Sequence, residues 1–169
     1  MTLSEVNALD RGRFVAALGG VFEHSAWVAE AAWPQRPFAN LDALHAAMIA
    51  AMGEASQDAK LALIRAHPEL AGKAAIRGEL TADSTREQSG AGLTDCSPQE
   101  FTRLQELNRA YTMKFGFPFI IAVKGLDRAA IIARLAQRLE RDRPTELAEA
   151  LSQIARIARL RLEAMVEAR

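Results

Sequence analysis

Helical periodicity of the apolar residues constrains this chain more than any other feature, because it runs through nearly the whole sequence. Leu41, Leu44, Met48 and Met52, for example, recur at spacings of three and four residues, which places them on one face of a helix. The pattern predicts an all-α fold, a single-domain bundle of about eight to nine helices over residues 1–169.

Capping residues place the starts of several predicted helices. Thr2 with Glu5 and Ser97 with Glu100 each fit a capping box, and Asn40 is a suitable N-cap. A short first helix is expected after Thr2, and further helices over about residues 13–22, 27–34, 41–53, 56–67, 98–114 and 127–141, with a last helix past Pro144 reaching nearly to the C-terminus.

Two stretches interrupt the helical pattern. From Glu69 to Ser97 the sequence is polar and rich in Gly, Ser and Thr, which predicts a long loop, and loops of that length are often functional. Near residues 115–125, Gly116 and Pro118 break the helix. We therefore expect a non-helical, ligand-binding segment there.

The apolar residues Phe119, Ile120, Ile121, Ala122 and Val123 form an extended run within that second interruption. Their backbone N–H and C=O groups have no partner inside a helix, so either another segment of the chain or a ligand must satisfy them. Because an otherwise helical sequence offers no obvious partner strand, we favour a planar polar ligand. A buried connection between helices is the alternative.

Charge and composition exclude several classes of function. The 21 basic and 21 acidic residues give a formal net charge of +0, which lacks the positive field that nucleic acid attracts. The single cysteine, Cys96, cannot form an intrachain disulfide, and no export signal or membrane-length apolar run is recognisable. We expect a cytoplasmic protein that binds neither nucleic acid nor membranes.

Metal and cofactor motifs are missing from the sequence. His24, His45 and His67 are not spaced as metal ligands, no glycine-rich phosphate loop is present, and Cys96 has no neighbouring histidine. The sequence therefore argues against metal, nucleotide and thiol chemistry.

Three features could carry chemistry. His67 ends a predicted helix before Pro68 and either faces a pocket or caps the helix. The run from Asp83 to Gln88 offers a carboxylate, an amide and a hydroxyl, or is a solvated turn entering a short helix. Arg161 lies at the centre of the apolar face of the last helix, so it needs an anion, either an internal carboxylate or a ligand.

Three motifs in one order resemble a known family. They are His67-Pro68-Glu69-Leu70, Ser84-x-x-Glu87-Gln88-x-x-Ala91-Gly92-Leu93, and Asn108-x-x-Tyr111-x-x-Lys114-Phe115-Gly116-Phe117-Pro118-Phe119-Ile120, followed by Arg161-Leu162. This combination resembles the 2-oxo-4-hydroxy-4-carboxy-5-ureidoimidazoline (OHCU) decarboxylases of urate breakdown, which form (S)-allantoin.

The resemblance implies an all-helical, cofactor-free carboxy-lyase that is usually a homodimer. Residues at the positions of His67, Glu87 and Arg161 would serve catalysis. Substrate would be bound by Pro68, Ser84, Gln88, Phe119, Ile120, Ile121, Ala122 and Val123, the last five through backbone amides. Two other interpretations stay open, a hydrolase acting on a related ureide and a non-catalytic helical ligand-binding module.

Overall fold

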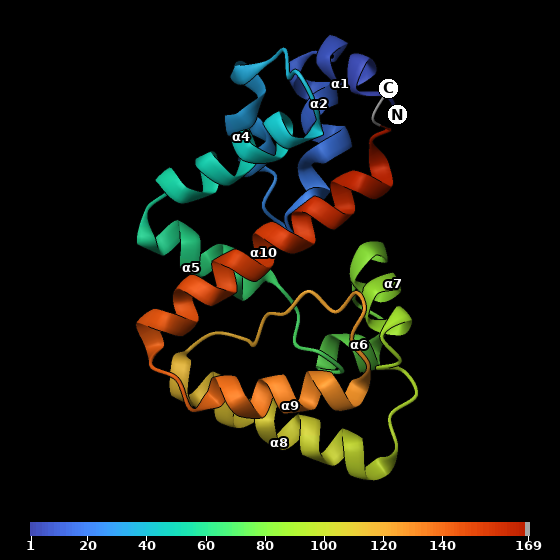
Figure 1. The fold of residues 1–169 in the computed structure, drawn as a ribbon, viewed down its shortest axis with the longest axis vertical. Helices are drawn as coiled ribbons and strands as arrows, with labels where there is room; N and C mark the ends of the chain where they lie inside the picture. The colour runs from blue at the N-terminus through green and yellow to red at the C-terminus, as the bar shows by residue number, and fades with distance from the viewer. Residues whose placement is uncertain (168–169) are drawn as a thin grey trace. The chain divides into compact units, whose positions relative to one another are not determined.

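The chain is helical through most of residues 1–167, which are those that the computed structural model describes (Figure 1). These residues form ten α-helices and two 3-10 helices, with no strand beyond an isolated bridge between Thr2 and Glu167. The predicted all-α fold class is confirmed. The chain divides into two compact units, which are described separately below, so the prediction of one domain over 1–169 stays a prediction.

Unit 1 contains residues 1–66 and the chain from Ala155 onward. Thr2 caps its first helix in the predicted capping box, and the Asn40 side chain accepts a hydrogen bond from the Ala43 N–H. Its helices are α1 (Leu3–Ala8), α2 (Arg11–Leu18), η1 (Gly19–Val21), α3 (Trp27–Ala32), η2 (Trp33–Gln35), α4 (Leu41–Glu54), α5 (Gln57–Ala66) and the C-terminal part of α10 (Arg143–Met165).

The core of unit 1 lies where α2, α3 and α4 pack together. Phe14, Leu18, Val28, Leu44 and Met48 are all 0–1% exposed there. Of the apolar positions spaced by three and four in α4, Leu44, Met48 and Met52 are therefore buried as predicted, whereas Leu41 is half-buried.

Unit 2 spans His67–Ile154. Its helices are α6 (Lys73–Arg77), α7 (Ala82–Gly90), α8 (Pro98–Phe115), α9 (Arg128–Leu139) and the N-terminal part of α10. Ser97 and Glu100 form the predicted capping box of α8. The last helix begins before Pro144, not past it, because proline fits the first turn, where its missing N–H has no intrahelical partner to lose.

The prediction of a long loop from Glu69 to Ser97 was wrong, because two short helices lie within it. Thr81 caps α7 by accepting a hydrogen bond from the Ser84 N–H, and Gly78, with φ +68°, ends α6 in the left-handed region. The polar composition of α7 hid the helix from an analysis based on apolar periodicity. These two helices bring the number of α-helices in residues 1–167 above the predicted eight or nine.

An aromatic cluster forms the centre of unit 2, where α8 and α9 pack together. The ring of Tyr111 lies 4.5 Å from Phe115, 6.1 Å from Phe117 and 5.4 Å from Phe119, measured between centroids. Gly116, with φ +78°, ends α8 in the left-handed region and lets the chain turn back over the helix. The alternating phenylalanines therefore anchor the chain that leads into the non-helical segment.

Candidate functional site

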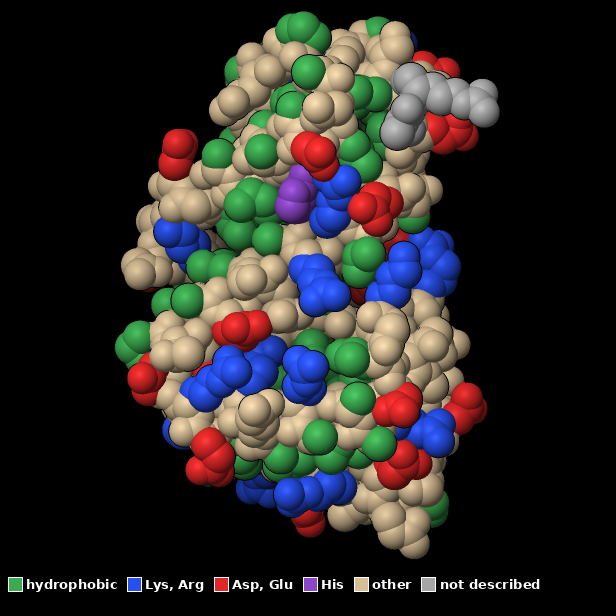
Figure 2. Space-filling view, viewed as in Figure 1, with side chains coloured by type: hydrophobic (Ala, Val, Ile, Leu, Met, Phe, Trp, Pro, Cys, Tyr) green, Lys and Arg blue, Asp and Glu red, His purple; other side chains and the backbone are tan. Residues whose placement is uncertain are grey.

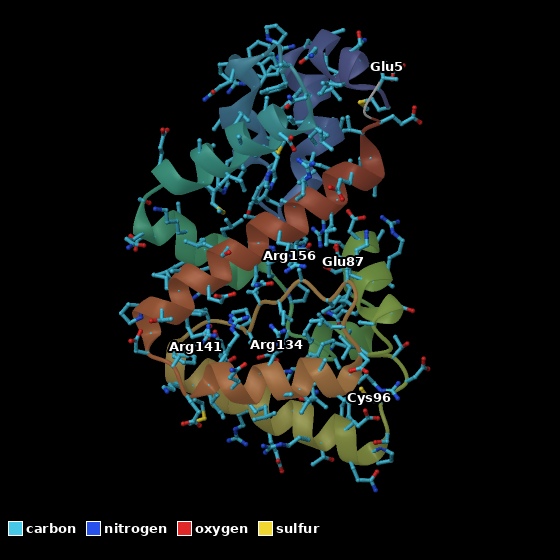
Figure 3. All side chains as sticks on the ribbon, viewed as in Figure 1. Glu5, Glu87, Cys96, Arg134, Arg141 and Arg156 are labelled. Atoms are coloured by element: carbon cyan, nitrogen blue, oxygen red, sulfur yellow. The ribbon has the colours of Figure 1, made fainter. Side chains whose placement is uncertain are left out.

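The candidate residues His67 and Pro68 follow directly after the end of α5 at Ala66. The side chain of His67 is buried, at 6% exposed. Glu87 lies on α7 (labelled in Figure 3). Ser84 lies three residues before Glu87 and four residues before Gln88, and this spacing places all three on one side of the helix. Ser84 and Gln88 are each 4% exposed. The run from Asp83 to Gln88 is thus part of a helix, and two of its polar side chains are buried.

The turn after Pro68 is held by side-chain amides from two helices. The carbonyls of three successive residues, Glu69, Leu70 and Ala71, accept hydrogen bonds from Gln88 Nε2 at 3.3 Å, Asn108 Nδ2 at 2.9 Å and Gln105 Nε2 at 2.8 Å. Ala71 has φ +49°, a left-handed conformation that costs free energy for a residue with a side chain. The amides therefore fix a strained turn next to His67.

Gln88 has a structural task that the sequence did not reveal. Its Oε1 accepts a hydrogen bond from the Ala71 N–H at 2.9 Å, while its Nε2 donates to the Glu69 carbonyl. Gly72 lies so close that a Cβ there would meet the Glu69 Cβ at 2.8 Å, so the turn has no room for a side chain. Substrate binding by Gln88 stays a prediction, and the amide would have to combine it with this contact.

The segment Phe119–Val123 is non-helical, as predicted, and all five residues are buried. The Val123 carbonyl accepts a hydrogen bond from the Leu126 N–H at 2.9 Å, and two further backbone groups have side-chain partners. The Ile120 carbonyl accepts a hydrogen bond from Arg138 Nη1 at 2.6 Å, and the Ala122 N–H donates to Gln153 Oε1 at 2.9 Å. A side chain of α10 therefore already accepts a hydrogen bond from the Ala122 N–H, and binding of a ligand by the backbone amides of this segment stays a prediction.

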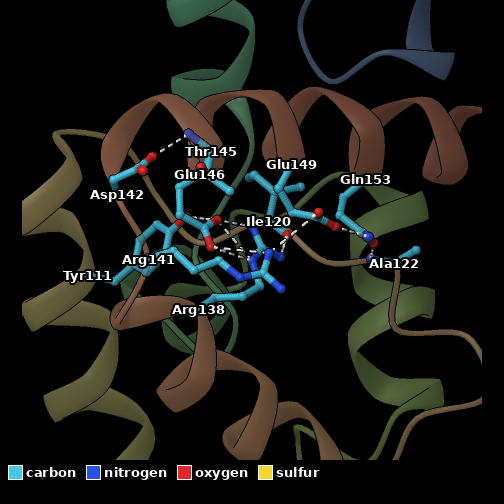
Figure 4. A network of polar contacts seen from close by, with 10 residues as sticks. All are labelled: Tyr111, Ile120, Ala122, Arg138, Arg141, Asp142, Thr145, Glu146, Glu149 and Gln153. Carbon is cyan, nitrogen blue, oxygen red and sulfur yellow. Dashed lines mark hydrogen bonds and ion pairs between the residues drawn. The ribbon is translucent and has the colours of Figure 1, made fainter.

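Arg138 belongs to a buried polar cluster that joins α8, α9 and α10 (Figure 4). Its Nε lies 3.0 Å and 2.9 Å from the two carboxylate oxygens of Glu146, and its Nη2 lies 2.7 Å from Oε2. The Tyr111 hydroxyl donates to Glu146 at 2.8 Å, and the Arg138 guanidinium lies 4.5 Å from the centroid of the Phe119 ring. Burial, together with the bond to Glu146, raises the pKa of Tyr111, so its hydroxyl remains a donor.

Sequence analysis missed Arg138 and Glu146, although a signal for Arg138 was present. Arg138 lies seven residues after Ile131 and three residues after Leu135, so all three share the buried face of α9. This is the same signal, a charge on an apolar helical face, that drew attention to Arg161. Extending that test to α9 would have found the cluster.

Arg161 lies in unit 1 and has an internal anion. Its Nη1 is 2.9 Å from Glu23 Oε2, and the two side chains are only 4% and 2% exposed. The carbonyls of Gly20 and Val21 lie 3.4 Å from the same nitrogen. The sequence left open whether the anion near Arg161 is a carboxylate of the protein or a ligand, and the structure contains a carboxylate, that of Glu23. A catalytic role for Arg161 stays a prediction.

Cys96 remains a poor candidate for nucleophilic chemistry, because burial raises the pKa of its thiol and thereby disfavours the thiolate. Among residues 1–167, no three His, Cys, Asp or Glu side chains are grouped as a metal site requires. In the same range no helix is both long and apolar enough to cross a membrane. On the face shown in Figure 2, Lys and Arg side chains are interspersed with Asp and Glu.

Comparison with known families gives a match over nearly the whole chain. A family model described as OHCU decarboxylase matches residues 7–163. The 2-oxo-4-hydroxy-4-carboxy-5-ureidoimidazoline decarboxylase of Haloferax volcanii is 43% identical over 162 residues, which are 96% of this chain and 94% of that protein. The enzyme of the same name from Mus musculus is 40% identical over 162 residues, 96% of this chain and 91% of its own length.

A solved structure supports the same relationship. The crystal structure of (S)-allantoin synthase matches with a TM-score of 0.78 and 30% identity, and the match covers 98% of this chain. The chain spans 54% of that larger protein, so the likeness concerns about half of it.

Proposed function

Because this chain belongs to the OHCU decarboxylase family, we propose that it converts 2-oxo-4-hydroxy-4-carboxy-5-ureidoimidazoline to (S)-allantoin and CO₂ in urate breakdown. The observation that carries the proposal is the match over residues 7–163, together with relatives of about the same length that are 40% and 43% identical. The enzyme would be a carboxy-lyase that works without cofactor or metal.

Loss of CO₂ from this substrate requires no external electron sink. The carboxylate is attached to a carbon that also bears a hydroxyl and adjoins the ring C=N, so the ring can delocalise the charge that departing CO₂ leaves behind. The protein must hold the carboxylate, polarise the hydroxyl and deliver a proton to one face of the carbon. Delivery to one face gives the product its handedness.

Three residues are proposed for these tasks. His67, at the buried corner after α5, would be the acid or base, and Glu87 on α7 its partner or the group that orients the ureido substituent. Arg161 would anchor the substrate carboxylate. A guanidinium carries five N–H donors, so contact with Glu23 is compatible with contact to a second anion.

Substrate binding is proposed for the residues around these three. Pro68 follows His67, Ser84 lies on the same face of α7 as Glu87, and Phe119–Val123 supplies backbone amides. Gln88 would contribute while it holds the Ala71 turn. We further propose that the protein is cytoplasmic and a homodimer, and light scattering on the purified chain would test the second point.

The activity is tested with purified protein and freshly generated OHCU, without added metal. Accelerated CO₂ release and optically active allantoin are expected, and a chelator should make no difference. Racemic allantoin formed at the uncatalysed rate would reject the proposal. Ligand-induced stabilisation without turnover would indicate a binding module, and products without CO₂ would indicate a hydrolase.

The role of His67 is tested by His67→Gln, with His45→Gln as the matched control. His45 contacts the Ala155 carbonyl at 2.8 Å in unit 1 and has no proposed role in the reaction. Turnover should fall by about 10² or more in His67→Gln, if the imidazole transfers a proton in the slow step, with little change in melting temperature. Nearly full kcat would make His67 a helix-capping residue.

A further inference from the structure

Three polar side chains on α8 bind the turn that follows Pro68. They are Gln105, Asn108 and Thr112, and their spacings of three and four residues place them on one face of the helix. The three bonds run from Gln105 Nε2 to the Ala71 carbonyl at 2.8 Å, from Asn108 Nδ2 to the Leu70 carbonyl at 2.9 Å, and from Thr112 Oγ1 to Glu69 Oε1 at 3.1 Å. Successive residues of the turn are therefore held in reverse order along α8.

Only Pro68 separates His67 from this turn, and the connection is stiff. The proline ring fixes its own φ and also restricts the backbone of the residue before it. Ala71 has φ +49°, a conformation that a residue with a Cβ keeps only where its surroundings enforce it. His67 is 6% exposed, so its imidazole has little room to move independently of its backbone. A displacement of the turn would therefore displace the imidazole.

Asn108 has an uncommon hydrogen-bonding state for a buried side chain. It is 2% exposed and its Nδ2 donates to the Leu70 carbonyl, but its Oδ1 has no partner within residues 1–167. A buried acceptor without a donor costs free energy, and such groups are rare in native structures. A leucine would fill a similar volume without this cost. The stability of α8 therefore gives little reason for an asparagine here, whereas holding the turn does.

We propose that Asn108 and Thr112 are positioning residues for the reaction, which hold the imidazole of His67 in place through the turn Glu69–Ala71. This inference rests on the proposed function. Asn108 holds a carbonyl of the turn, and Thr112 holds the side chain with which the turn begins. Neither residue is proposed to touch the substrate. Their loss should therefore slow proton transfer, which depends on the exact place of the imidazole, and leave ligand affinity nearly unchanged.

Asn108→Leu tests the proposal on the full chain. The substitution removes one unpaired acceptor, Oδ1, and leaves another, the Leu70 carbonyl, so the melting temperature should change by only a few degrees. The kcat for CO₂ release should fall about tenfold or more, while the Kd for (S)-allantoin stays within about twofold. Unchanged kcat, or an equal loss of kcat and of affinity, would overturn the positioning role.

Asn7→Leu is the matched control. The Asn7 amide also holds a backbone, in unit 1, where it donates to the Phe38 carbonyl at 2.9 Å and accepts from the Phe38 N–H at 2.8 Å. Its loss leaves a donor and an acceptor without their partner, so the melting temperature should fall further than in Asn108→Leu. The kcat should stay within about twofold. A tenfold loss of kcat in this control would show that turnover follows stability and would overturn the proposal.

Thr112→Val and Thr112→Ser form a second, milder pair. Valine keeps the shape of threonine without its hydroxyl, and serine keeps the hydroxyl that donates to Glu69 Oε1. We expect kcat to fall about threefold or more in Thr112→Val and to be rescued in Thr112→Ser. The NMR signal of the His67 imidazole, assigned with His67→Gln, should shift only in the valine variant. Equal behaviour of the two variants would overturn the role of Thr112.

The inference and the proposed function fail in different ways. If the unsubstituted protein does not accelerate CO₂ release, the proposed function is wrong. A shift of the His67 signal in Asn108→Leu and Thr112→Val, but not in Asn7→Leu, would then still show that α8 positions the imidazole. If the protein is active and neither kcat nor the His67 signal changes in these variants, the inference alone is wrong.

Discussion

Arg138 and Arg161 are both buried cations, and each is paired with a glutamate from another element of its own unit. Arg138 contacts Glu146 through Nε and Nη2, with side chains 4% and 0% exposed. Arg161 contacts Glu23 through Nη1, with side chains 4% and 2% exposed. In burial and charge the two pairs are nearly equivalent, yet only Arg161 is proposed to hold the substrate.

The pairs differ in how the chain brings them together. Arg138 and Glu146 are 8 residues apart on consecutive helices, so the pair forms as soon as α9 packs on α10. Glu23 and Arg161 are 138 residues apart, so their pair requires unit 1 to be complete. A charge on an apolar helical face therefore shows that an anion must be near, but only the structure shows which anion it is.

The largest effect is expected from Arg161→Leu. The substitution removes the guanidinium that lies 2.9 Å from the buried Glu23 carboxylate, which should lower the free energy of unfolding by about 3–5 kcal/mol. Turnover should be nearly lost as well, because leucine cannot hold the substrate carboxylate. Urea unfolding and CO₂ release measure the two effects.

Arg161→Lys separates the two effects, since lysine keeps the positive charge but not the planar fork of donors. We expect this variant to recover part of the stability and little of the turnover. A leucine variant that unfolds more easily but turns over normally would make Arg161 purely structural. The two arginines would then have the same kind of role.

Glu146→Gln should have the next largest effect. Glutamine keeps the shape of the side chain but leaves the Arg138 cation buried without a counter-charge, which should cost about 1.5–3 kcal/mol in unfolding free energy. Glu149→Gln is the matched control, because Glu149 is 32% exposed and its ion pair with Arg141 is longer, at 3.6 Å. Equal losses in both variants would show that burial of the Arg138 pair does not matter.

Local signals in the sequence predicted much of the fold. The capping boxes of Thr2 and Ser97 and the cap at Asn40 are present as expected, because a cap depends on residues only three positions apart. The helices α6 and α7 were missed because their stability does not come from an apolar stripe. In α7 only Ser84 and Gln88 are buried, and both are polar.

The candidate site could be predicted only in part, for a related reason. The position of His67 before Pro68 and the break at Gly116 are properties of neighbouring residues, and the structure contains both. The partners of Gln88 and Arg161 come from distant positions, Ala71 and Glu23, and no periodicity reveals them. The sequence therefore predicted features that depend on neighbouring residues, but not the hydrogen bonds and ion pairs between residues far apart in the chain.

Tyr111→Phe should have a smaller effect than Glu146→Gln. The phenol donates one hydrogen bond to Glu146, while Arg138 still neutralises the carboxylate, so a loss of about 0.5–1.5 kcal/mol is expected. The packing of the ring against Phe115 and Phe119 is kept. Thermal unfolding would measure the change. A loss as large as that of Glu146→Gln would show that the phenol is an essential partner of the carboxylate.

The smallest effect is expected from Arg159→Ala, which lies on α10 only two residues before Arg161. Arg159 is 31% exposed and pairs at the surface with Asp42 and with Glu163, the latter at 2.8 Å. Water and salt screen such pairs, so the free energy of unfolding should change by less than about 1 kcal/mol, and less still at high salt. The free energy of unfolding of Arg159→Ala and of Arg161→Leu should be measured at low and at high salt. If Arg159→Ala proved as damaging as Arg161→Leu, burial would not be what distinguishes the arginines of this helix. The cost of removing Arg161 would then reflect the helix itself and not its buried pair with Glu23.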